Sequence, residues 1–389
     1  MSKRAKKTIK EVGGLEEYLE SCSNSKILAG FHGGRSLWST YQEIKTNLCP
    51  IQEEVVTGAL VEALASGREE CNRKLEEVCS SKDSTENILR KVSEIISEDY
   101  LIFLNDHGPS HVEKVIEKAN QILTKNTMGP ELSEAECFIL LCAIQIHDIG
   151  SIYGRNNHEK KTGEMLAEKS TNIITDKPEL RVIENVAMVH GGKIKGSKDT
   201  ISKLPESETI CDQEIRPRLL AAILRFADEL ADDLSRANTV ALEMDLIGDS
   251  SKIFHVYSKA LHTVKLSPIE NGLNHEVQLV YELQVDDLRE KYKYNKVEKY
   301  LLDEIYDRTL KMERERRYCS KFLYSFIRIG KINVRINIYG EDSLPVDNIS
   351  YTLEDVSYPN DLPLGGIKDI NNQIPSGEEE FLLLIGGAR

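Results

Sequence analysis

Histidine and aspartate recur in five short segments near the middle of the chain, each inside or beside a stretch with helical periodicity. In chain order, the candidate side chains are His111, the adjacent pair His147 and Asp148, His158, His190 and Asp228. Imidazole and carboxylate are the ligand types with which proteins hold catalytic first-row transition metals. We therefore predict that these six residues bind one or two divalent metal ions.

The adjacent pair His147 and Asp148 is the most informative of these segments. Consecutive side chains in a regular helix point about 100° apart, so they rarely reach the same ion. At a helix end the backbone departs from that geometry, and both side chains can point to one place. Gly150 follows directly after Ile149, as is typical of a helix C-terminus.

The ligand types restrict the choice of metal. Four imidazoles and two carboxylates contain too much nitrogen for a dedicated magnesium or calcium site, which prefers oxygen ligands. They suit manganese, iron, cobalt, nickel or zinc. One ion would be held by His111, His147, Asp148 and Asp228. A second ion would be held by His158 and His190, with Asp148 bridging the two. Such a centre could lower the pKa of a bridging water towards about 7, and the resulting hydroxide could attack phosphorus.

Charged residues near these segments are candidates for substrate binding and catalysis. Arg155 lies in a loop between two proposed ligand segments, which makes it the first candidate for both roles. Three further candidates for phosphate binding are Lys193, Lys195 and Arg225. Glu159, beside His158, could donate a proton to the leaving group, or it could stabilise a helix N-terminus instead. Asp148 is predicted to be catalytic through the metal. The sequence contains no recognisable motif of an activated serine or cysteine nucleophile.

Composition limits the class of protein. The 389 residues are enough for more than one domain, and the net charge of −14 argues against bulk binding to nucleic acid while permitting a local basic pocket. No stretch approaches the roughly 18 apolar residues of a membrane span. The eight cysteines form no CxxC pair, so we expect reduced thiols and a cytoplasmic protein without a membrane partner.

Helical periodicity explains how the proposed ligands could be brought together. Apolar residues recur with the helical period over residues 84–98, 111–124, 133–147, 159–169, 179–190 and 217–234. Ser133 with Glu136 three residues later forms a capping-box pattern, and Pro217 opens the last, strongly apolar helix. These segments predict a compact helical core that carries the metal ligands at or near helix ends.

The pattern changes after residue 250. Alternating or β-branched apolar residues predict strands over 252–257, 263–266, 276–285, 332–339, 348–353 and 379–385, with a return to helix over 286–318. We divide the chain into an N-terminal helical region (1–85), the helical core (86–250), a β-hairpin insertion with returning helices (251–330) and a small β-rich C-terminal region (331–389). The predicted fold class is mainly α.

Over roughly residues 100–240 the chain resembles the HD-domain metal-dependent phosphohydrolase superfamily. His111 stands for the first histidine of that family, His147 and Asp148 for its namesake pair, and Asp228 for its final aspartate. His158 and His190 look like the additional histidines of the branch that binds two metals. The resemblance implies an HD-domain helical core, here with a β-strand insertion and a small β-rich C-terminal appendage. It also implies hydrolysis of phosphoester or phosphoanhydride bonds, usually in nucleotides.

Two departures narrow this expectation. Ser151 stands where HD-GYP phosphodiesterases carry a lysine, and no Gly-Tyr-Pro follows His190, so cyclic di-GMP is not assigned as the substrate. We expect a phosphohydrolase acting on a nucleotide-type small molecule, and the terminal regions could mediate a homo-oligomer. Two alternatives remain open: a nucleotide-sensing HD module in a multi-protein, defence-related system, and an HD-type nuclease.

Overall fold

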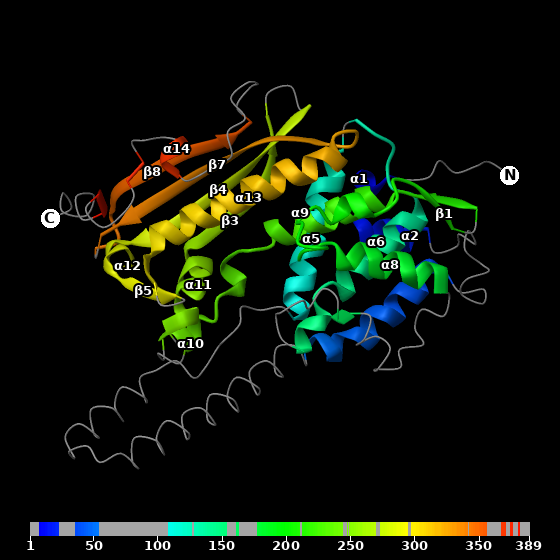
Figure 1. Ribbon diagram of the computed structural model, residues 1–389, viewed down its shortest axis with the longest axis horizontal. Helices are drawn as coiled ribbons and strands as arrows, with labels where there is room; N and C mark the ends of the chain where they lie inside the picture. The colour runs from blue at the N-terminus through cyan, green and yellow to red at the C-terminus, as the bar shows by residue number, and fades with distance from the viewer. Residues whose placement is uncertain are drawn as a thin grey trace, which may run out of the picture.

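The computed structural model describes residues 8–22, 36–53, 108–126, 128–153, 161–162, 177–210, 212–243, 247, 249–269, 273–294, 297–340, 342–355, 367–370, 374–375 and 380–381. Helices gather on one side of the molecule and a four-stranded sheet lies on the other, with the long helix α13 (Leu301–Leu323) crossing from one to the other (Figure 1). The predicted fold class, mainly α with β structure in the C-terminal half, is confirmed.

Four helices form the centre of the helical side: α5 (Pro109–Thr124), α6 (Glu134–Ile146), α8 (Lys177–Met188) and α9 (Pro217–Leu230). Every residue of α6 is buried, because α2 (Leu15–Ser21), α5, α8 and α9 surround it. A helix that is apolar on all sides must be enclosed in this way. The predicted capping box of Ser133 and Glu136 begins α6, and Pro217 occupies the first turn of α9.

Smaller elements complete the fold on both sides of the molecule (Figure 1). At the N-terminus, α1 (Ile9–Val12) precedes α2, and residues 37–53 are helical. The short elements are η1 (Ile149–Tyr153), η2 (Ile201–Lys203), β1 (Glu208–Ile210), β2 (Gln213–Ile215), η3 (Leu234–Arg236), α10 (Thr239–Glu243), α11 (Asp249–Ala260), α12 (Val285–Arg289) and α14 (Ile367–Ile370).

The sheet has the strand order β3-β4-β7-β8, with β3 (Leu261–Pro268), β4 (Asn274–Gln284), β7 (Arg328–Tyr339) and β8 (Pro345–Glu354). The central pair β4 and β7 is parallel, and the outer pairs are antiparallel. Parallel neighbours need a crossover connection, which α13 supplies. Alternate residues of the two central strands are buried, and α13 packs against β7 and β8 (Figure 1).

Two element predictions after residue 250 were wrong. Residues 252–257 belong to helix α11, where Ile253, Val256, Tyr257 and Ala260 are buried at helical spacing. The predicted helix over 286–318 is interrupted between α12 and α13 by a hairpin of β5 (Lys291–Tyr294) and β6 (Val297–Tyr300). Burial over residues 291–293 alternates as in a strand, since only Tyr292 is buried.

The sheet crosses one of the predicted domain divisions. Strands β3 and β4 come from the region 251–330, whereas most of β7 and all of β8 come from the region 331–389, yet the four strands form one sheet. The predicted helix over 84–98 lies outside the described residues, as does most of the predicted helix over 159–169. Most of the predicted strand over 379–385 also lies outside them, and the two residues described there, 380 and 381, are helical. None of the described helices is long and apolar enough to cross a membrane.

Candidate metal centre

Side chains from the ends of four helices meet at one place in the helical core. His111 lies in the first turn of α5, His147 and Asp148 directly follow α6, His190 follows α8, and Asp228 lies in the last turn of α9. Three of these helices therefore present C-terminal ends to the site. Because a helix C-terminus carries partial negative charge, this arrangement favours a cation.

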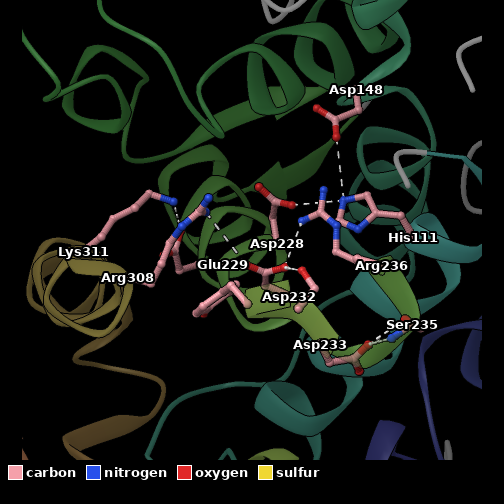
Figure 2. A network of polar contacts seen from close by, with 12 residues as sticks. His111, Asp148, Asp228, Glu229, Asp232, Asp233, Ser235, Arg236, Arg308 and Lys311 are labelled. Carbon is pink, nitrogen blue, oxygen red and sulfur yellow. Dashed lines mark hydrogen bonds and ion pairs between the residues drawn. The ribbon is translucent and has the colours of Figure 1, made fainter. Parts of the chain in front are cut away.

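The imidazole nitrogens and carboxylate oxygens lie close enough to share a metal ion. His111 Nε2 is 3.2 Å from Asp228 Oδ1 and 3.7 Å from Asp148 Oδ2 (Figure 2). His147 Nε2 is 3.4 Å from Asp148 Oδ2 and 3.7 Å from Asp228 Oδ1. His190 Nε2 is 3.5 Å from the other oxygen of Asp148, Oδ1. Asp148 thus faces His111 and His147 with one oxygen and His190 with the other, as a carboxylate that bridges two ions would.

Three of these residues meet the spacing of a metal site most closely. The candidate ligand atoms of His111, His147 and Asp148 all lie within 4.8 Å of one another, and all three residues are buried. The ring centroids of His147 and His190 are 5.0 Å apart, so His190 extends the cluster from the α8 side.

Backbone carbonyl groups fix the orientation of two histidines. His147 Nδ1 lies 2.8 Å from Ile144 O, and His190 Nδ1 lies 2.6 Å from Ala187 O. Because a carbonyl oxygen only accepts, each Nδ1 must carry the hydrogen and donate it. In a neutral ring the Nε2 lone pair then faces the carboxylates, which is the arrangement that metal-binding histidines require.

The charges within the cluster also fit a bound cation. Burial and the positive charge of Arg236 lower the pKa of His111, which favours its neutral form. Burial opposes a charge on His147, but Asp148 and Asp228 outweigh it and raise the pKa of His147 well above its ordinary value. Burial alone would raise the pKa of Asp228, yet the contacts with His111 and His147 lower it well below its ordinary value. The two carboxylates thus favour positive charge at this place, and a divalent cation would supply it.

The end of α6 explains how two consecutive residues reach one place. The helix stops at Ile146, and the chain turns into η1, where Ser151 N donates to Asp148 O at 2.9 Å. His147 keeps helical dihedral angles as the C-terminal capping residue, whereas Asp148 lies beyond the helix. The sequence-based interpretation of His147 and Asp148 as a helix-end pair agrees with this geometry.

The remaining predicted site residues fall into three groups, of which Arg225 forms the third. His158, Arg155 and Glu159 lie outside the described residues. Lys193 and Lys195 are exposed in the segment after His190. They are absent from the lining of the cavity described below.

Arg225 lines the cavity beside the cluster, but its guanidinium already has partners. Its Nε and NH2 donate to the two oxygens of Glu315 at 2.7 and 2.9 Å, and its NH1 donates to Thr200 Oγ1 at 2.9 Å. The Arg225 guanidinium carbon also lies 4.6 Å from the centre of the Tyr318 ring. Its predicted role in substrate binding stays a prediction.

A cavity of about 290 Å³ opens directly from the cluster, and Asp148, His190 and Asp228 form part of its wall. Four cationic residues that were not predicted from the sequence line the cavity: Lys198, Arg236, Arg308 and Lys311. Two of them belong to α13, some 80 residues after Asp228, and no local pattern links that helix to the HD segments. The chemistry of the wall suits an anionic ligand next to a metal.

Comparison with known proteins supports the assignment of the central region. A sequence model of the HD-CE family matches residues 98–311, which is more than half of the chain and includes every proposed metal ligand. No curated protein and no solved structure matches the chain. The matched region ends at Lys311, so it also takes in the first half of α13.

Proposed function

Because the chain belongs to the HD-CE family, we propose that it is a phosphohydrolase that cleaves a phosphoester or phosphoanhydride bond of a nucleotide with one or two divalent metal ions. The family match and the buried cluster support an HD-type metal-dependent hydrolase in general. The observation that carries the finer proposal is the close approach of His111, His147 and Asp148 beside a cavity lined with cations.

The chain would hold the metal through the described cluster together with His158, which lies outside the described residues. His111, His147, Asp148 and Asp228 would bind one ion, and His190 with His158 would bind a second, with Asp148 between them. When bound, the metal would lower the pKa of a coordinated water towards about 7 and neutralise charge on the phosphoryl oxygens. Manganese, iron, cobalt, nickel and zinc all suit this donor set.

Residues around the metal would orient the substrate and move protons. The cationic wall of the cavity would attract phosphate oxygens and hold them against the metal side. Arg155 and Glu159, which flank His158 in sequence, are proposed to bind phosphate and to protonate the leaving oxygen, respectively. Lys193, Lys195 and Arg225 remain further candidates for phosphate binding.

A hydrolysis assay tests this function. Purified protein would be supplied separately with manganese, iron, cobalt, nickel and zinc, and offered nucleoside triphosphates, cyclic nucleotides, dinucleoside polyphosphates and short single-stranded nucleic acids. We expect metal-dependent turnover of at least one nucleotide, lost by more than about 100-fold in Asp148→Asn, since removing a ligand charge weakens the metal and its chemistry. Asp286→Asn, at an exposed position of α12, is the matched control.

The outcomes of this assay separate the competing functions. Turnover of nucleic acid strands alone would favour an HD-type nuclease. Nucleotide binding without turnover under every metal would contradict the hydrolase proposal and favour a nucleotide sensor.

A further inference from the structure

Arg308 of α13 is held in one orientation at the wall of the cavity. Its Nε donates to Glu304 Oε1 at 2.7 Å, one turn earlier on the same helix. The guanidinium carbon lies 5.2 Å from the centre of the Phe254 ring and 5.3 Å from that of Tyr257. Both aromatic residues belong to α11, so the arginine is packed between two helices. An arginine fixed through Nε and its planar face presents its two terminal nitrogens in one direction.

Those terminal nitrogens have no hydrogen bond to any described residue. Besides Glu304, the guanidinium has an acidic neighbour in Asp232, whose Oδ2 lies 3.9 Å from Arg308 NH1, beyond hydrogen-bond distance (Figure 2). Asp232 is shared, because its Oδ1 lies 3.8 Å from Arg236 NH1. The Asp232 carboxylate therefore faces two guanidinium groups, and its contact with Arg308 is longer than a hydrogen bond. Arg308 retains the paired donors that bind a phosphate in bidentate fashion.

Two of the cationic side chains of the cavity lie on the side away from His111. Figure 2 shows Arg308 and Lys311 on the α13 side, with Asp228 between them and His111. Apart from the metal ligands Asp148 and Asp228, the wall contains five cationic side chains and three carboxylates. Glu229 is paired with Lys311 at 2.6 Å, and Glu315 is paired with Arg225. With a metal bound at the aspartates, the cavity would carry a surplus of positive charge.

We propose that Arg308 binds a second phosphate of the substrate, next to the phosphate at the metal centre. The substrate class is then a compound with a phosphoanhydride, such as a nucleoside di- or triphosphate, rather than a simple phosphomonoester. This inference rests on the proposed function. The size of the cavity agrees with it, because about 290 Å³ lies just below the usual range for whole drug-sized ligands and suits the charged end of one. Tyr257 is the one tyrosine, phenylalanine or tryptophan in the described wall; it is buried, and the Arg308 guanidinium carbon lies 5.3 Å from its ring centre.

The test compares inorganic phosphate with pyrophosphate as ligands of the manganese-loaded protein, using isothermal titration calorimetry. Under the proposal, pyrophosphate engages the metal and Arg308 together, whereas one phosphate engages only one of them. We expect the wild-type protein to bind pyrophosphate more tightly than phosphate. In Arg308→Gln that preference should fall by about 10- to 100-fold, the loss expected for hydrogen bonds to a charged group, while phosphate affinity changes little.

Arg317→Gln is the matched control, because Arg317 lies on the same helix and makes the same Nε contact, at 2.7 Å, with a glutamate one turn earlier, Glu313. It should keep the preference for pyrophosphate. Arg308→Lys, which keeps the charge and the aliphatic stem but lacks the paired donors, guards against misfolding of the glutamine variant and should lose part of the preference. Melting curves of each variant verify folding.

Two results would overturn the assignment: a wild-type protein without preference for pyrophosphate, or an Arg308→Gln variant that keeps the wild-type preference. Neither result depends on turnover, so the subsite can fail while metal-dependent hydrolysis stands. Conversely, a subsite that binds pyrophosphate through Arg308 without any hydrolysis of the nucleotide panel would leave the binding inference intact and contradict the proposed function.

Discussion

His147 and Asp148 are consecutive in the chain, yet His147 Nε2 lies 3.4 Å from Asp148 Oδ2. The two side chains converge because α6 ends at Ile146 and the chain then turns into η1. Convergence at this one helix end places two adjacent residues beside His111 from α5 and Asp228 from α9. The proposed metal centre therefore depends on where α6 stops as much as on which residues follow it.

Metal binding should stabilise the protein in a way that depends on His147. A ligand at about 100 times its Kd stabilises the folded state by about 2.7 kcal/mol, provided that the unfolded chain does not bind it. We expect the melting temperature to rise on addition of manganese to the metal-free protein and to fall again with a chelator. His147→Ala should abolish the rise, and differential scanning fluorimetry measures both effects.

His262→Ala is the control for that experiment, because His262 is an exposed histidine on β3. It should show the wild-type response to manganese. An equal rise in melting temperature for His147→Ala and the wild type would show that manganese stabilises the chain at another place.

The start of α6 should contribute strongly to stability through Glu136. This buried carboxylate accepts from Ser133 N at 2.9 Å, from Arg216 N at 3.0 Å, and from Arg216 Nε and NH2 at 2.7 and 2.8 Å. Ser133→Ala removes one cap and should cost about 1 kcal/mol. Glu136→Ala breaks the whole network and should cost about 3 kcal/mol, the low end for a buried pair because Arg216 can still reach water. Urea unfolding measures both, and equal costs would contradict the network.

The pair of Arg225 and Glu315 should hold α13 against α9. Both side chains are largely buried, so Arg225→Met leaves an uncompensated carboxylate and should cost about 3–5 kcal/mol in the free energy of unfolding. Replacing both residues, as in Arg225→Met with Glu315→Leu, should recover much of that loss. Thermal unfolding of the two single variants and the double variant gives the coupling energy.

The same variants decide between a structural and a substrate-binding role for Arg225. A structural role predicts that the double variant recovers stability and keeps substrate affinity near that of the wild type. Recovered stability with a KM raised more than about tenfold would assign Arg225 to substrate binding as well.

The His-Asp pair and the main helices could be predicted because their signals are local. Ser133 and Glu136 are three residues apart, Pro217 begins its helix, and the pair His147–Asp148 directly precedes Gly150. In each case the residues that decide the structure are neighbours in the chain. The close approach of His111 and Asp228 follows once the helices that carry them pack against each other.

The failed predictions concern features that tertiary packing decides. Ile253 and Val256 favour a strand by type, but burial against the rest of the fold at helical spacing makes this segment α11. The cationic side of the cavity could not be found in the same way, because Arg308 reaches it only when α13 packs against α9 and α11. Single arginines and lysines on an amphipathic helix are usually surface residues, so their types alone carried no signal.

The metal content and the manganese affinity of the protein test the proposed metal centre most directly. Isothermal titration calorimetry on the metal-free wild type, Asp148→Asn and Asp228→Asn would be combined with elemental analysis of the loaded proteins. We predict one or two ions per chain in the wild type and at least about a tenfold loss of affinity in each variant, because each removes a charged ligand from a buried site. Wild-type affinity and stoichiometry in Asp148→Asn would contradict the assignment of this cluster as a metal centre.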